Sequence, residues 1–219
     1  MRANRTLRSF LSAFCLLLTA YCLPGCNIGG ALAYKAFGPA KVKADYAPPK
    51  QPLLVLVENY SHSADLQPSA DQLGTLVIAD LKAHKVGPLV DPNPLYTLRS
   101  EKPGEYEKMK IPDIGRFVGA KQVIYVDLQE CQVKAVPGAD VIKGKIAAKV
   151  RVVDVDTGQT KWPDTGVSHP VETGTDYVRK ETDAPLAVRG QMIQELSMKI
   201  GRLFYGHQPD YDLGRGEPD

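Results

Sequence analysis

The sequence has few cysteines and histidines, and several common catalytic signatures are missing from it. Three of the four cysteines fall within the first 26 residues, so Cys131 stands alone in the remainder and no internal disulfide can form there. A lone cysteine without a partner motif is typical of a small buried apolar residue. The four histidines lack metal-ligand spacing, and there is no phosphate-binding loop, nucleophile elbow or zinc-binding helix motif. The sequence therefore predicts neither metal nor cofactor.

A strong charge of one sign is also lacking. The formal net charge is +2, but Arg2, Arg5 and Arg8 lie in a leader of 25 residues that contains no acid. Removing this leader leaves 24 basic against 25 acidic side chains, which is a net charge of −1. Proteins that bind nucleic acid through its phosphates carry a basic footprint, so nucleic acid is not expected as a partner.

The apolar run near the N-terminus is too short to span a bilayer as an ordinary helix. It extends over 14 residues, from Phe10 to Leu23. At about 1.5 Å per residue a helix of this length covers roughly 21 Å, against about 30 Å of hydrocarbon core. A cationic start followed by a short apolar run is typical of a signal peptide.

The end of this run, Leu23-Pro24-Gly25-Cys26, resembles the lipobox of bacterial lipoproteins. The resemblance implies that a diacylglycerol is attached to Cys26 and that the chain is cleaved before it. Two or more acyl chains hold a protein firmly on a membrane, whereas one binds marginally. By the same resemblance, an aspartate directly after Cys26 would indicate retention in the inner membrane. The residue there is Asn27, and the absence of aspartate favours the outer membrane. The alternative is an ordinary secretory signal.

Composition divides the chain into four segments. Residues 1–25 form the signal peptide, and residues 26–52, rich in Gly, Ala, Pro and Lys, form a tether from the lipid anchor. Residues 53–205 form the folded domain, which is long enough to bury a proper core. Residues 206–219 are predicted to be a disordered tail.

The first half of the domain reads as a buried strand followed by helices and loops. Val-rich residues 53–57 predict a central strand. Ser69 and Gln72 match a capping box, and apolar residues at helical spacing follow them. The predicted elements are a strand over 53–57, a helix over roughly 70–84, a weak strand at 89–90, a loop over 91–111 and a short helix over 112–119.

The second half predicts an antiparallel meander and a final helix. Residues 142–154 alternate between apolar and largely cationic side chains, as in a half-buried strand. The predicted elements are strands over 122–129 and 142–154, a turn at 156–158, a return strand from 159, a loop over 163–183 and a helix from 184 to 205, with Leu186 on its apolar face. The order β-α-β-α-β-β-β-α predicts an α+β fold, a mixed sheet with helices packed on it.

Two segments carry a family resemblance. Residues 114–126 form a helix, a Gly-Ala pair and a strand, and residues 150–162 form a hairpin around Asp156-Thr157-Gly158. Both are similar to a superfamily of bacterial envelope proteins that includes the curli-export lipoprotein CsgG, the penicillin-binding-protein activator LpoB and the N-terminal domain of TolB. The resemblance implies a non-enzymatic periplasmic adaptor that binds other proteins or assembles with its own copies. No pair of long amphipathic segments is present to form a membrane-spanning hairpin as in the curli exporter.

The candidate partner-binding residues lie on the cationic side of the strand over 142–154. They are Lys143, Lys145, Lys149 and Arg151, which could face an acidic partner, an anionic lipid or a glycan. The plainer interpretation is a solvated face that lysines protect from aggregation.

The sequence thus predicts a lipid-anchored adaptor or assembly factor in the periplasm, with membrane lipid and envelope proteins as partners. One alternative is an envelope enzyme that uses the loops 60–68 or 163–183, where His62 and Asp65 are the first residues to test. The other is a subunit of a ring-forming export complex, which would make the protein a homo-oligomer.

Overall fold

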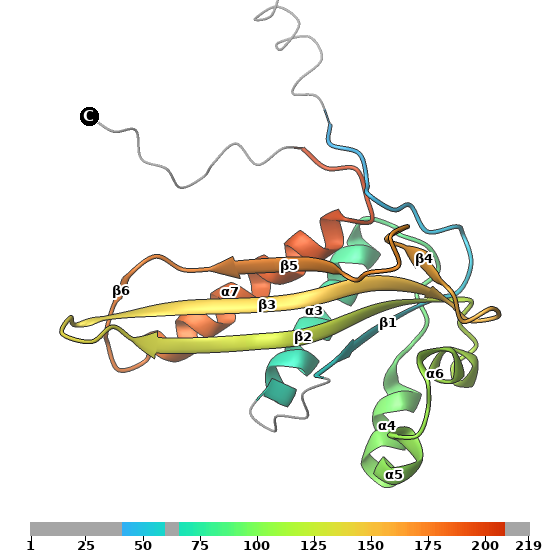
Figure 1. The fold of residues 1–219 in the computed structure, drawn as a ribbon, viewed down its shortest axis with the longest axis horizontal. Coiled ribbons are helices and arrows are strands. Elements are labelled where there is room, and N and C mark those ends of the chain that lie inside the picture. Colours follow the sequence, from blue (N-terminus) through green and yellow to red (C-terminus); the bar gives the residue numbers. More distant parts are fainter. Residues whose placement is uncertain (1–40, 60–65, 209–219) are drawn as a thin grey trace, which may run out of the picture. The chain divides into compact units, whose positions relative to one another are not determined.

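The domain is built on a mixed β-sheet with helices on both faces. The computed structural model describes residues 41–59 and 66–208, and within these ranges the sheet has six strands (Figure 1). Strand β1 (Leu53–Glu58) runs parallel to β2 (Gln122–Ala135), and every other pairing is antiparallel. The predicted α+β class is confirmed.

Strand β3 is the hub of the sheet. It spans Val141–Asp154 and pairs with β2 along one edge; along its other edge it pairs with three shorter strands, β4 (Thr160–Trp162), β5 (His169–Gly174) and β6 (Val178–Arg179). Five helices are described: α3 (Gln67–Ala83), α4 (Asn93–Glu101), α5 (Pro103–Tyr106), α6 (Ile111–Phe117) and α7 (Ala184–Arg202).

Helices α3 and α7 cover one face of the sheet along most of its length (Figure 1). The even-numbered side chains of β3 from Ile142 to Val152 point toward them and are buried, because alternate residues of a strand face opposite sides. Met192, Ile193 and Leu196 of α7 are fully buried against this face. At Gly144 a β-carbon would lie 2.5 Å from the Met192 sulfur, so the missing side chain lets α7 approach β3 closely.

The opposite face is covered by described helices at one end only. Helices α4, α5 and α6 pack there over β1 and the start of β2, around a second apolar cluster. Its members are Leu54, Leu56, Leu95, Leu98, Tyr106, Ile114, Ala120, Val123, Tyr125 and Val155. Beyond this cluster the sheet continues without a described helix above it.

The start and the end of the domain run side by side. The amide of Val42 donates to the His207 carbonyl at 2.8 Å, and the amide of His207 donates to Val42 at 3.1 Å. The amide of Tyr46 donates to the Leu203 carbonyl at 3.0 Å, and its hydroxyl lies 3.2 Å from Oε1 of Gln122. Part of the segment predicted as a tether is therefore attached to the domain. Among the described residues, no helix combines the length and the apolar character needed to cross a membrane.

The structure corrects the predicted start of the first helix. Helix α3 begins at Gln67 with Pro68 in its first turn, where a missing amide hydrogen costs nothing. Ser69 lies inside the helix, is 2% exposed and does not cap it. Residues 89–90 make only an isolated bridge between Leu89 and Leu53 instead of the predicted strand.

Two predicted loops contain regular structure. Residues 91–111 hold α4 and α5, since Leu95 and Leu98, three residues apart, bury one face of a helix that opens with Asn93-Pro94. Residues 163–183 hold β5 and β6, which complete the edge of the sheet beside β3. Leu186, expected on the buried face of α7, is 73% exposed.

Candidate binding surface

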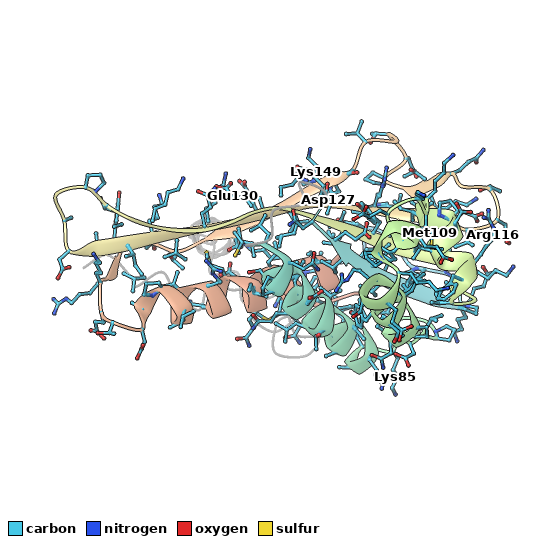
Figure 2. All side chains as sticks on the ribbon, turned by 90° about the horizontal axis from the view of Figure 1, so that it is seen from below. Lys85, Met109, Arg116, Asp127, Glu130 and Lys149 are labelled. Carbon is cyan, nitrogen blue, oxygen red and sulfur yellow. The ribbon has the colours of Figure 1, made fainter. Side chains whose placement is uncertain are left out.

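The uncovered part of the sheet is the candidate functional surface. We call it the open face: the side of β2, β3 and β5 opposite α3 and α7. Figure 2 shows it from the side, with Asp127, Glu130 and Lys149 on it and the two helices beneath the strands. It consists of Asp127, Glu130, Gln132 and Lys134 of β2, Lys143, Lys145, Ala147, Lys149 and Arg151 of β3, and Pro170, Glu172 and Gly174 of β5.

All four predicted cations lie on the open face. Lys143, Lys145, Lys149 and Arg151 are odd-numbered residues of a regular strand whose even-numbered residues are buried, so strand geometry gives them one side. An antiparallel sheet commonly leaves one face to solvent in this way. Whether they bind a partner stays a prediction.

Acidic residues from the neighbouring strands interrupt the cationic row. The Lys145 Nζ lies 3.3 Å from Oε2 of Glu130 on β2 and 3.9 Å from Oε2 of Glu172 on β5. Lys143 is directly opposite Lys134, and its Nζ lies 5.7 Å from the ring centre of Tyr177. The open face therefore carries both signs of charge in adjacent columns.

Lys149 and Arg151 differ from Lys145, because neither has an ion pair with any residue that the structure describes. The Arg151 guanidinium carbon lies 5.0 Å from the centre of the Tyr125 ring, which stands directly opposite on β2. Its Nε is buried and has no hydrogen-bond partner within the described ranges. A buried polar atom left without a partner costs about 1–3 kcal/mol.

A cavity of about 660 Å³ lies where the open face meets the segment that joins α5 to α6. Its volume is within the usual range of ligand pockets, roughly 300–1,000 Å³. Charged and phenolic groups on one side face an apolar wall on the other. The lining residues include Glu58, Tyr106, Tyr125, Asp127, Lys149 and Arg151, and the wall includes Met109, Ile111 and Ile114.

Two tyrosines line this cavity together with the carboxylate of Glu58. The Tyr106 hydroxyl lies 2.5 Å from Oε1 of Glu58. Burial raises the pKa of Tyr106, and the charge of Glu58 and this hydrogen bond raise it further. Burial likewise raises the pKa of Tyr125, followed by the charges of Glu58 and Asp127. Both hydroxyls therefore stay protonated and can donate to Glu58 at neutral pH.

The exposed edge of β5 is protected against pairing with another strand. The amide of Thr175 donates to the Gly144 carbonyl of β3. Since alternate residues of an antiparallel strand bond to the same neighbour, the main-chain groups of Pro170 and Glu172 point away from β3, toward the exposed edge. Proline has no amide hydrogen to offer there. Lys199 of α7 donates to the Glu172 carbonyl at 3.3 Å. The open face, and not this edge, is thus the available surface.

Other residues singled out in the sequence are placed as follows. Cys26, His62 and Asp65 lie outside the described residues. Cys131 is buried with a free thiol. The ring of His169 lies 5.2 Å from that of Trp162. Across the described parts of the chain, no group of three potential metal-binding side chains comes together.

Comparisons with known proteins leave the family open. No family model and no curated protein matches the sequence. The domain is similar to several solved structures. One is lipoprotein GNA1162 from Neisseria meningitidis (14% identity, 68% of this chain and 97% of that chain, TM-score 0.46).

Two further structures are similar at the same level. A minor lipoprotein from Acinetobacter baumannii has 10% identity, covering 70% of this chain and 91% of that chain, with a TM-score of 0.40. A PelC dodecamer from Paraburkholderia phytofirmans has 16% identity, covering 75% and 94%, with a TM-score of 0.39. Similarities of this size assign no family. The superfamily of CsgG, LpoB and TolB stays a prediction.

Proposed function

We propose that this protein is a lipid-anchored adaptor of the bacterial cell envelope, without enzymatic activity, that binds another envelope protein on the open face of its sheet. The observation that carries the proposal is the open face itself. A long stretch of β2, β3 and β5 carries charged side chains of both signs and has no described helix above it. Surfaces with interleaved charges select partners by electrostatic complementarity.

The location follows from the leader. The lipobox-like residues 23–26 supply an anchor at Cys26, and Asn27 favours the outer membrane. The main chain enters the domain at Val42, beside His207, and the open face lies on β2, β3 and β5. Anchored in this way, the protein can present its sheet to a partner in the periplasm.

Photo-crosslinking tests the proposal in the native cell envelope. A photoreactive phenylalanine analogue replaces Gln132 on the open face, and a matched variant carries it at Gln72, an exposed glutamine of α3. We expect a discrete protein adduct from position 132 and none from position 72. Reversing one charge with Lys145→Glu should reduce the yield at position 132 severalfold. No adduct at position 132, or equal adducts at both positions, would contradict the proposal.

A further inference from the structure

The cavity at the end of the open face holds a cation, Arg151, whose Nε has no hydrogen-bond partner among the described residues. We propose that this cavity binds a carboxylate of the partner protein, presented by an acidic side chain within an apolar segment, with Arg151 as its main ligand. The inference rests on the proposed function and names the point at which the partner would be anchored.

The geometry of Arg151 favours a carboxylate. Its guanidinium is stacked near the ring of Tyr125 at 5.0 Å, which holds the planar group in place. A guanidinium donates two parallel hydrogen bonds to a carboxylate, and this arrangement is stronger than a bond between neutral groups. The Nε lacks a partner in the described structure and has almost no exposed surface, so a carboxylate would bind the terminal N–H groups and would reach Nε only after the side chain turns.

The neighbouring charges favour a peptide over a bare anion. Lys149, two residues before Arg151 on the same face, and Lys110 add two further cations to the cavity lining, and neither has an ion pair with a described residue. Glu58, Glu107 and Asp127 lie in the same lining and repel an ion with several negative charges. A peptide side chain brings a single negative charge and is therefore repelled less.

The opposite wall of the cavity is apolar, and for this reason we expect apolar residues on both sides of the partner's acidic residue. Met109, Ile111 and Ile114 line the cavity from the α5–α6 segment. Ile114 is 3% exposed and belongs to the second apolar cluster, so the wall is backed by the core. Side chains of the size of leucine, next to the acidic residue of the partner, would be buried against this wall.

A second hollow, of about 720 Å³ at the far end of the sheet, lacks these properties. Two of its four lysines have carboxylate partners: Lys145 lies 3.3 Å from Glu130, and Lys199 lies 3.1 Å from Glu195. A ligand that binds either of them would have to break an existing ion pair. No arginine lines this hollow, so the paired hydrogen bonds that a guanidinium offers to a carboxylate are found in the first cavity.

Two blocked peptides test the inference with the full chain in detergent micelles. The probes are acetyl-Leu-Glu-Leu-amide and its Gln counterpart, titrated while the Nε–H resonance of Arg151 is followed by NMR. We expect the Glu peptide to bind at least tenfold more tightly than the Gln peptide and to shift this resonance. Arg151→Lys keeps the positive charge but loses the paired N–H donors of the guanidinium. It should reduce the preference for the Glu peptide over the Gln peptide to below threefold. Lys149→Ala should weaken the binding of the Glu peptide about threefold.

A matched control and a competitor complete the test. Arg179→Lys, at an exposed position of β6 outside the cavity, should leave the tenfold preference unchanged. Equal binding of the two peptides, a preference that survives Arg151→Lys, or displacement of the Glu peptide by inorganic phosphate at lower concentration would each overturn the inference. If the peptides fail while Gln132 still forms its specific adduct, the adaptor function stands and only the carboxylate site is lost.

Discussion

Two glycines that occupy helices should respond to the same substitution in opposite directions. Gly115 lies in α6 and Gly190 in α7, and alanine is about 1 kcal/mol more favourable than glycine inside a helix. At Gly190 a β-carbon would meet nothing within 4 Å. Gly190→Ala should therefore raise the free energy of unfolding by about 0.5–1 kcal/mol.

At Gly115 the new methyl group would collide with rigid neighbours. A β-carbon there lies 2.5 Å from Cγ2 of Val155 and 3.0 Å from Cγ2 of Val123, both fixed in the second apolar cluster. Overpacking a core costs about 1–3 kcal/mol, which exceeds the helical gain. Gly115→Ala should lower the free energy of unfolding by up to about 2 kcal/mol once the helical gain is subtracted.

Urea unfolding of both variants, made in a Cys26→Ser background to remove the predicted lipid, measures the difference. With a slope of about 2 kcal/mol per molar urea, the two midpoints should differ by about 0.3–1.5 M. Near-ultraviolet circular dichroism checks that each variant is folded before titration. Equal midpoints, or a more stable Gly115→Ala protein, would refute the close approach of α6 to Val155 and Val123.

Three further predictions concern the anchor and two titratable groups. Cys26→Ser should move the protein from the membrane to the soluble fraction on cell fractionation, and unchanged membrane binding would exclude Cys26 as the anchor. Burial, then the hydrogen bond to Asp80 at 2.8 Å, raises the pKa of Tyr205. Its contribution to stability is therefore complete below the ordinary tyrosine value, about 10, and is lost as the pH rises beyond it. Tyr205→Phe should lower stability by about 1 kcal/mol at pH 7 and flatten the decline in alkaline urea titrations. Hydrogen bonds from the amide and hydroxyl of Thr157 lower the pKa of Asp154. This contribution is present above about pH 4 and is lost on acidification, so Asp154→Asn should make urea midpoints less dependent on pH between 4 and 2.

The elements with a strong periodic pattern could be predicted from the sequence. Strand β3 alternates over its full length, and its predicted bounds, 142–154, differ from the structure by one residue. Helix α4 was hidden because Asn, Pro and Asp around residue 93 are also turn residues, and only two buried leucines distinguish the helix. Strand β5 could not be predicted, because it is defined by its pairing with β3 and its own residues show no clear strand pattern.

The cavity could not be predicted, because its residues come from segments far apart in the chain. Glu58 ends β1, Tyr106 ends α5, and Arg151 lies near the end of β3. Each has an ordinary local context, and the hydrogen bond between Glu58 and Tyr106 joins residues 48 positions apart. The one sequence signal was the cationic row itself, which located Lys149 and Arg151 but not the groups opposite them.

One irregularity explains why the acidic partner of Lys145 was missed. The alternation of β2 breaks after Leu128, and the sequence pattern therefore predicts a strand that ends at Gln129. The structure has a β-bulge there: Leu128 pairs with Ala148 and Glu130 with Ala147, so that Gln129 is an extra residue. A bulge shifts the phase of a strand by one residue. Glu130 is therefore turned to the open face, within 3.3 Å of Lys145, and Cys131 is turned into the core. Without the bulge Cys131 would lie on the open face and Lys145 would lose its closer carboxylate. The closer of the two ion pairs of Lys145 on the proposed binding surface thus depends on a single inserted residue.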